Sequence, residues 1–191
     1  MFVAICGIDG SGKSTIAAEL VNRLRESSKK TAFEREPTLW LERLNAELEF
    51  KTDLERVALF SADRANHQQT LQDAIAKNDF VICDRYSLCT YAYNCESDLA
   101  LLTHNRLDKF FLQPDLTVLL DCDVNLALER IETRGSDRYS FLEKEEKLNA
   151  VRKRYLTKIS LINSEKSLVL DSSKSVDELA IAILSKLGVA N

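Results

Sequence analysis

The chain has 191 residues, of which 45% are hydrophobic and 29% charged, with a formal net charge of −4. This length fits one domain with its own core, and the composition is that of an ordinary globular protein. The acidic balance argues against nucleic acid as a partner, so we expect none. No apolar run approaches the roughly 20 residues that span a bilayer, and no basic segment precedes Phe2, so we expect neither a membrane partner nor a signal peptide.

Cysteine usage indicates a reducing compartment. The number of cysteines is five, which is odd, and no two of them have C-x-x-C spacing. This pattern argues against a disulfide framework and against a zinc site. We therefore expect free thiols in a cytoplasmic protein. The cysteines are Cys6, Cys83, Cys89, Cys95 and Cys122.

The apolar residues 2–6 predict a first strand, and the segment after it matches the phosphate-binding pattern G-x-x-x-x-G-K-[ST]. The glycines let backbone N–H groups turn toward phosphate oxygens. Lys13 supplies a charge for the β and γ phosphates, and the Ser14 hydroxyl is placed to ligate Mg²⁺. A helix that begins here points its positive end at the anion. The alternative is an accidental glycine-rich turn. The residues expected to hold ATP are Gly7, Ile8, Asp9, Gly10, Ser11, Gly12, Lys13, Ser14 and Thr15.

Strand and helix patterns alternate along the rest of the chain. Thr52, Ser140 and Ser175 are each followed three residues later by a glutamate, as in a capping box at a helix start. Apolar residues recur at helical spacing over 141–163 and 176–187. Five strands alternating with helices predict a three-layer α/β fold with right-handed crossovers. The remaining strands are expected at 31–35, 80–83, 116–120 and 167–170.

The residues that follow the strands are candidates for chemistry, because ligands of such sheets lie at the carboxyl ends of the strands. Asp84 follows the third strand, where a phosphate-binding-loop protein places a second Mg²⁺ ligand. The adjacent Arg85 offers a two-pronged donor for a phosphate. The alternative for both residues is a helix N-cap and a surface ion pair.

A basic cluster follows the fourth strand. Arg130, Arg134 and Arg138 surround Gly135 and Ser136, and a loop of this kind could close over the transferring phosphates. The alternative is an ordinary exposed connection between helices.

Three segments together resemble the thymidylate kinase (dTMP kinase) family. They are residues 59–67, 84–86 and 114–121, and the similarity runs from Phe2 to about Leu187. The resemblance implies a P-loop nucleoside-monophosphate-kinase-like fold, with a five-stranded parallel sheet flanked by helices. It also implies a single kinase domain over 1–191 with a lid at about 134–142. ATP and dTMP are the implied substrates, and a homodimer is the implied assembly.

The resemblance assigns roles to the acceptor side. Phe60 and Arg64, spaced i, i+4 on one helix face, would stack on the thymine and donate to its O4. Arg85 would hold the acceptor phosphate, and Tyr93 would pack against the deoxyribose. Core packing remains an alternative for Phe60 and Tyr93, and a salt bridge for Arg64. The other expected acceptor contacts are Asp9, Glu36, Pro37 and Thr90, with His67 as a structural neighbour and a cis Glu36–Pro37 peptide bond.

Some positions depart from the family pattern. The segment 38–43 replaces the usual small-residue stretch, Cys89 stands where serine is usual, and Asn94 stands where glutamine is common. Gly10 occupies the place where eukaryotic-type members carry an arginine. A transition-state cation must then come from elsewhere, and Arg134 and Arg138 fit that role, as in bacterial-type lids.

The implied reaction is direct in-line transfer of the ATP γ-phosphoryl group to dTMP, which gives dTDP for dTTP biosynthesis. Lys13, Arg85, Arg134 and Arg138 are the expected catalytic residues, and Ser14 and Asp84 the expected Mg²⁺ ligands.

A kinase for another (deoxy)nucleotide or for a deoxynucleoside is the main alternative. A GTPase would need an Asn-Lys-x-Asp motif, which is absent. A P-loop ATPase that drives a partner is disfavoured by the acidic balance and by the Arg64 and Arg85 constellation.

Overall fold

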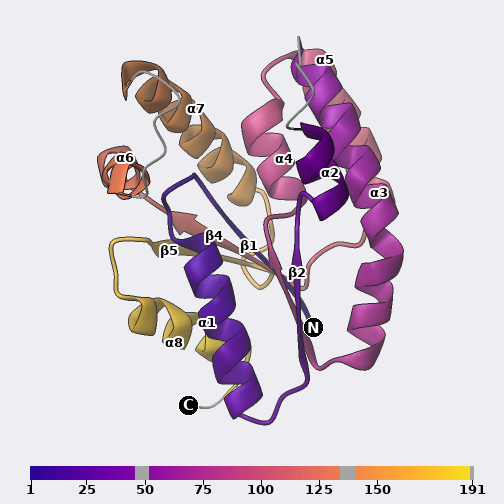
Figure 1. Cartoon of the computed structure of the whole chain (residues 1–191), viewed down its shortest axis with the longest axis vertical. Coiled ribbons are helices and arrows are strands. Elements are labelled where there is room, and N and C mark those ends of the chain that lie inside the picture. The colour runs from indigo at the N-terminus through magenta and orange to yellow at the C-terminus, as the bar shows by residue number, and fades with distance from the viewer. Residues whose placement is uncertain (46–51, 134–140, 190–191) are drawn as a thin grey trace.

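A computed structural model describes residues 1–45, 52–133 and 141–189. All five predicted strands are present and pair in parallel in one sheet, in the order β2-β3-β1-β4-β5 (Figure 1). Each strand begins at its predicted residue and ends at its predicted end or one residue beyond. The three-layer α/β prediction is therefore confirmed. The strands are β1 (Phe2–Gly7), β2 (Thr31–Arg35), β3 (Phe80–Asp84), β4 (Leu116–Asp121) and β5 (Ser167–Asp171).

Helices connect the strands. The predicted capping boxes at Thr52 and Ser175 are present, each with the side chain accepting from the backbone N–H three residues on. The predicted box at Ser140 lies outside the described residues. The helices are α1 (Lys13–Glu26), α2 (Leu39–Asn45), α3 (Asp53–Lys77), α4 (Ser87–Asn94), α5 (Asp98–Leu107), the 3₁₀ turn η1 (Asp108–Phe110), α6 (Val124–Thr133), α7 (Phe141–Ile159) and α8 (Val176–Lys186).

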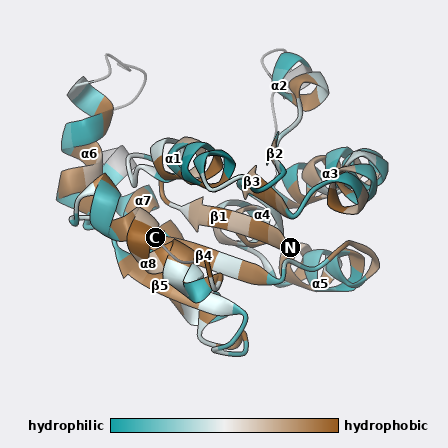
Figure 2. Ribbon diagram, turned by 90° about the horizontal axis from the view of Figure 1, so that it is seen from below, coloured by the Kyte–Doolittle hydropathy of each residue, from teal (hydrophilic) through white to brown (hydrophobic). Residues whose placement is uncertain are grey.

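The two faces of the sheet are covered by different helices. Val3 and Ile5 of β1 pack on the side of α1 and α8, whereas Phe2, Ala4 and Cys6 face the side of α3, α4 and α7. Figure 2 shows the apolar strands enclosed between helices that turn polar residues outward. Burial on both faces explains why the inner strands β1, β3 and β4 are near-continuous apolar runs.

Both predicted helical stripes are largely buried. Leu148, Val151 and Tyr155 of α7 pack into the core, as do Leu179 and its neighbours on α8. Val176 is an exception, because this first residue of α8 is 40% exposed. Within the described ranges, no helix has both the length and the apolar character needed to cross a membrane.

Candidate active site

The phosphate-binding loop joins β1 to α1 and wraps around a buried lysine. Gly12 adopts a left-handed backbone, with φ of 86°, directly before the first residue of α1. Lys13 is only 5% exposed, and its Nζ donates to the Ile8 carbonyl and to Asp9 Oδ1, both at 3.2 Å. Burial and the nearby positive charge of Arg85 lower the pKa of Lys13, and the Asp9 carboxylate opposes that effect. The loop thus holds its one cation at the start of a helix, where an anion is favoured.

Gly10 has no room for a side chain. Its φ is 84°, and a Cβ at this position would lie 2.3 Å from the carbonyl oxygen of Ala127 on α6. That distance is far inside van der Waals contact, and the obstacle is backbone that cannot rotate away. The loop and α6 are therefore packed directly against each other at this point.

Ser14 and Asp84 meet at the carboxyl ends of β1 and β3. The Ser14 hydroxyl donates to Asp84 Oδ2 at 2.5 Å. Asp84 is 2% exposed, and its Oδ1 is buried without a hydrogen-bond partner among the described residues. A buried carboxylate oxygen left unpaired is costly unless a ligand completes it. A hydroxyl beside a carboxylate oxygen is a donor set that suits Mg²⁺ or one of its water ligands.

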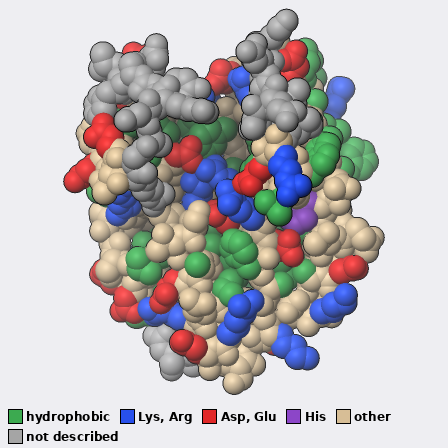
Figure 3. All heavy atoms as spheres, in the orientation of Figure 1, with side chains coloured by type: hydrophobic (Ala, Val, Ile, Leu, Met, Phe, Trp, Pro, Cys, Tyr) green, Lys and Arg blue, Asp and Glu red, His purple; other side chains and the backbone are tan. Residues whose placement is uncertain are grey.

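Asp9 holds two cations at once. Arg85 Nη2 lies 2.5 Å from Asp9 Oδ1, the oxygen that Lys13 also contacts. Burial would raise the pKa of Asp9, but Arg85 and Lys13 outweigh it and lower the value to about 2. Tyr93 completes the group, since its hydroxyl accepts from the Asp9 N–H at 2.8 Å and its ring lies under the Arg85 guanidinium at 5.7 Å. Figure 3 shows Lys and Arg side chains beside carboxylates near the middle of this face.

The backbone of Arg85 is unusual. Its φ is 71°, in the left-handed region that non-glycine residues seldom adopt. Its N–H donates to the Ile5 carbonyl at 3.0 Å, which fixes the turn after β3 to the middle of the sheet. Such outliers persist where the surroundings enforce them, and they concentrate at functional sites.

A second network of buried charges links α3 and α4 to the turn after β2. Arg64 is 1% exposed, and its Nη2 donates to Glu36 Oε2 at 2.6 Å and to Thr90 Oγ1 at 2.9 Å. Its guanidinium lies 4.9 Å from the Tyr86 ring centroid and 5.7 Å from that of Phe111. Burial would lower the pKa of Arg64, but Glu36 raises it above its ordinary value. The salt-bridge alternative for Arg64 is thus realised, although its Nε has no partner among the described residues.

The turn that presents Glu36 has the predicted form. The Glu36–Pro37 peptide bond is cis, which confirms the prediction. After it, the Thr38 N–H and hydroxyl both donate to Asp63 of α3, at 2.9 and 2.5 Å. The altered segment after Glu36–Pro37 is therefore tied to the helix that carries Arg64.

The remaining acceptor-side predictions fall on α3 and α4. Phe60 is half-buried, one helical turn before Arg64, and Thr90 and Asn94 are buried on α4. Burial alone would raise the pKa of the Cys89 thiol, but a hydrogen bond with the Cys6 thiol and the charge of Arg85 bring it down to about 6. The structure thus joins Arg64 to Thr90 and Arg85 to Tyr93, and both Thr90 and Tyr93 belong to α4.

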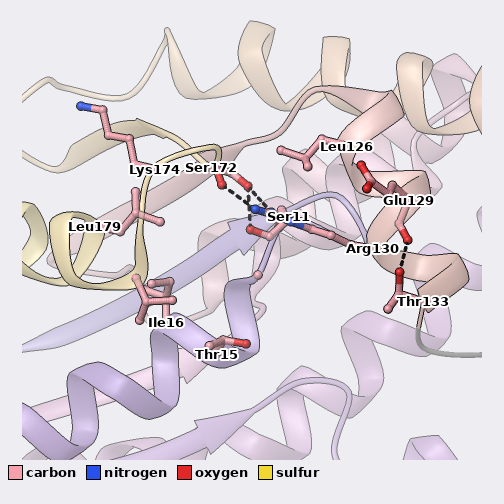
Figure 4. Close-up of a pocket in the computed structure, with 12 residues that line it drawn as sticks. Ser11, Thr15, Ile16, Leu126, Glu129, Arg130, Thr133, Ser172, Lys174 and Leu179 are labelled. Carbon is pink, nitrogen blue, oxygen red and sulfur yellow. Dashed lines mark hydrogen bonds between the residues drawn. The ribbon is translucent and has the colours of Figure 1, made fainter.

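An open cavity of about 500 Å³ lies on the other side of the loop (Figure 4). Arg130 of α6 crosses its wall and donates to Ser172 Oγ at 2.9 Å, to the Ser172 carbonyl at 3.1 Å and to the Gly10 carbonyl at 3.3 Å. Ser172 Oγ in turn donates to the Ser11 carbonyl at 2.9 Å. The cavity is lined by Ser11, Gly12, Thr15, Ile16, Leu126, Glu129, Arg130, Thr133, Ser172, Lys174, Val176 and Leu179.

The sequence interpretation missed Ser172 and Lys174 at this cavity. Both directly follow β5, and the carboxyl end of a parallel strand was the signal that could have identified them. Arg130 was expected in a closing loop, but it lies within α6 and is tied to the loop after β5. Arg134 and Arg138 lie outside the described residues, as does most of the predicted lid.

Comparison with known proteins gives a consistent result. Residues 5–183 match the family model of thymidylate kinase. The chain is 34% identical over 179 residues to a probable thymidylate kinase of Sulfurisphaera tokodaii, covering 93% of this chain and 90% of that protein. It is 36% identical to a probable thymidylate kinase of Sulfolobus acidocaldarius, with 85% and 87% covered. It is also 31% identical to a thymidylate kinase of Pelobacter propionicus, with 97% and 93% covered.

Proposed function

Because this chain belongs to the thymidylate kinase family, we propose that it transfers the γ-phosphoryl group of ATP directly to dTMP. The product, dTDP, is a precursor of dTTP. The observation that carries the proposal is the contact of Lys13 and Arg85 with the same oxygen of Asp9. One cation belongs to the donor loop and the other to the acceptor side, so the two phosphates would meet at Asp9.

In this proposal, the Asp9 carboxylate contacts the two cations that the substrate phosphates would contact. Without substrate, this carboxylate keeps the cationic Lys13 and Arg85 close together although they repel each other. The acceptor phosphate is itself an anion near pH 7, so the reaction needs no strong general base. Catalysis then consists of positioning and of charge stabilisation by preorganised donors. Lys13 would hold the donor phosphates, and Arg85 would hold the acceptor phosphate.

Mg²⁺ is part of the proposal, and Ser14 and Asp84 would hold it. The support is the unpartnered, buried Asp84 Oδ1 next to the Ser14 hydroxyl. When bound, the ion neutralises charge on the donor phosphates.

The nucleoside of ATP would occupy the cavity beside Arg130 and Ser172. It opens next to Gly12 and Thr15 of the phosphate-binding loop, so a triphosphate in the loop would extend its nucleoside in this direction. Leu126 and Leu179 supply apolar surface for a base, and Arg130 supplies a planar cation held in place by its hydrogen bonds to Ser172 and Gly10. We propose that Arg134 and Arg138 come from the lid and stabilise the transferring group.

On the acceptor side, Phe60 would stack on thymine, and Arg64 and Thr90 would contact its polar edge. Tyr93 would lie against the deoxyribose at the position where a 2′-hydroxyl would clash. The support is that the Tyr93 hydroxyl accepts from the Asp9 N–H while its ring lies under the guanidinium of Arg85, the residue expected to hold the acceptor phosphate. Glu36 and Pro37 would form a wall of the site.

We also propose a single kinase domain, a homodimer and a cytoplasmic location. Support for the homodimer comes from apolar side chains exposed on and after α5: Leu99 is 57% exposed, Leu102 48% and Phe110 82%. Light scattering of the purified protein tests this, and replacement of Phe110 and Leu102 by serine is expected to give monomers. Support for the location comes from the five cysteines, all of which are free thiols.

Steady-state assays with dTMP, dUMP, dCMP, dGMP and thymidine as acceptors test the function. We expect the highest kcat/KM with dTMP. A higher value with another acceptor would move the assignment to the alternative kinase class. ATP hydrolysis that no acceptor stimulates would contradict a kinase altogether.

A further inference from the structure

His67 lies between two carboxylates, those of Glu34 and Glu36. It is 5% exposed, with Nε2 2.9 Å from Glu34 Oε2 and Nδ1 3.3 Å from Glu36 Oε1. Glu34 belongs to the edge strand β2, and Glu36 to the turn that follows it. One side chain of α3 therefore bridges the two acids that frame the end of that strand.

Glu36 transmits this contact to Arg64. Its Oε1 faces His67, while its Oε2 accepts from Arg64 Nη2 at 2.6 Å. The carboxylate is thus held at both oxygens, by two residues that share a face of α3 at spacing i, i+3. Without His67, only Arg64 would hold Glu36, and the terminal torsion of a glutamate has a broad minimum.

The charges in this cluster explain why a histidine suits the position. Glu34 and Glu36 carry two negative charges, and Arg64 carries one positive charge. Burial would lower the pKa of His67, but hydrogen bonds and attraction from Glu36 and Glu34 raise it above the ordinary value. Arg35 and Glu42 line a groove together with Glu34 and His67. They form an ion pair with each other, in which Arg35 Nη2 lies 2.9 Å from Glu42 Oε1. On β3, the Cys83 thiol has a raised pKa because of its burial and of Glu36, so it stays neutral.

We propose that His67 is a positioning residue for acceptor recognition, which holds the Glu36 carboxylate so that Arg64 presents its guanidinium to the base. This inference rests on the proposed function. Among the described residues, the hydrogen bonds of His67 reach Glu34 and Glu36 and not the phosphate-binding loop, so it acts through Glu36 and Arg64 on the base and not on the transferring phosphate. Its loss is expected to raise KM for dTMP and to leave kcat and KM for ATP near their wild-type values.

Two substitutions separate the two contacts of the ring. The amide nitrogen of asparagine takes the place of Nδ1, and that of glutamine takes the place of Nε2. His67→Asn thus keeps the donor toward Glu36, and His67→Gln keeps only the donor toward Glu34. We expect His67→Gln to raise KM for dTMP by roughly fivefold to tenfold, the size of one net hydrogen bond, and His67→Asn to change it less than threefold. The preference for dTMP over dCMP, as a ratio of kcat/KM values, should fall only in His67→Gln.

The pH dependence of that ratio is a further readout, because titrations common to both acceptors cancel. The pKa of His67 is raised, so the imidazolium prevails below it and is lost as the pH rises through it. The wild-type ratio is expected to fall as the pH rises through the pKa of His67, and to stay flat in His67→Asn. His104→Gln is the matched control, since His104 is the other buried histidine and contacts Ser87 instead of Glu36. Its ratio should match the wild type.

A measurement without substrate keeps this inference separate from the proposed function. Exchange of the Arg64 Nε–H with solvent, followed by NMR in the ligand-free protein, should be faster in His67→Gln and unchanged in His67→Asn. If a His67 variant does not fold, Glu34→Gln at a partly exposed position loosens His67 from outside and should shift both readouts in the same direction. Wild-type KM, ratio and exchange rate in folded His67→Gln would overturn the inference, while wild-type activity with dTMP would still uphold the kinase. Activity with another acceptor alone would contradict the proposed function, and the exchange rates would still decide the role of His67.

Discussion

The proposed donor and acceptor sides of this site are built from different chemical groups. The donor side uses backbone groups of one continuous loop, completed by Asp84 and by Arg130 held at the end of β5. The acceptor side uses side chains from four separate segments, with Glu36, Arg64 and Thr90 joined in a buried network. Its charges are paired with one another before any substrate arrives.

This difference indicates how each side recognises its substrate. Backbone donors in a rigid loop recognise the phosphates that all nucleoside triphosphates share. Buried side chains with paired charges can reject a wrong base, because a wrong base leaves polar groups without partners. Substitutions on the donor side should therefore act mainly on turnover, and those on the acceptor side mainly on selectivity.

Lys13→Ala should have the largest effect. Loss of the charge that contacts the transferring group is expected to lower kcat by about 10²–10³-fold, as removal of one preorganised donor does. Single-turnover kinetics measure this, with circular dichroism as the control for folding. A folded variant with near-normal turnover would contradict the hypothesis that the protein is a kinase.

Replacement of Arg134 or Arg138 by alanine should follow in size. A charge-assisted contact is worth about 1.5–3 kcal/mol, so kcat is expected to fall by roughly tenfold to a hundredfold. The dissociation constant of dTMP, measured by calorimetry, should change little, because the contact forms mainly in the transition state. If both single variants and the double variant keep wild-type kcat, the cation comes from elsewhere. Arg130 and Arg43, the arginine that ends the altered segment 38–43, are then next to test.

Arg64→Ala should raise KM for dTMP by about tenfold while KM for ATP stays within twofold, since a buried base carbonyl loses its donor. It also leaves Glu36 buried without its closest partner, so the melting temperature should fall. Arg64→Lys keeps a charge near Glu36 and serves as the control for stability. Equal losses in the use of dTMP and of ATP would indicate a purely structural arginine.

Tyr93→Ala should narrow the preference for dTMP over its ribose counterpart by a few fold, because a steric filter works by excluding the 2′-hydroxyl. Tyr93→Phe keeps the ring but loses the hydroxyl that accepts from the Asp9 N–H. The ratio of kcat/KM values should therefore change in the alanine variant and not in the phenylalanine variant. An unchanged ratio in Tyr93→Ala would rule out the filter.

Asp9→Asn should show the smallest effect, a change in how the melting temperature falls at acid pH. The pKa of Asp9 is lowered to about 2, so the ionised carboxylate stabilises the fold above its unfolded pKa of about 4 and loses this contribution as the pH falls toward 2. Asp9→Asn should flatten the fall in melting temperature between about pH 4 and 2. The effect is small because the Asp9 side chain is 48% exposed. Parallel curves for both proteins would show that Asp9 is not held by its cations in solution.

The same contrast explains how much the sequence could predict. Near-continuous apolar runs identified the buried strands β1, β3 and β4, and the phosphate-binding loop could be located because its residues are contiguous. The contacts of His67 with Glu34 and Glu36 could not be predicted, because they join residues more than thirty positions apart through side-chain rotamers. Ser172 has no local motif, and only the sheet order brings it to the loop that contains Gly10.

The contact of Gly10 with α6 also constrains how such a site can change over time. An arginine in this loop would bring its own Cβ to 2.3 Å from the Ala127 carbonyl, so it cannot be accommodated while α6 stays in place. In this chain, an arginine at position 10 therefore cannot simply replace an arginine of the proposed lid as the catalytic charge. During evolution, an arginine could replace Gly10 only after α6 had shifted away from the loop. Packing therefore decides the order of these two changes.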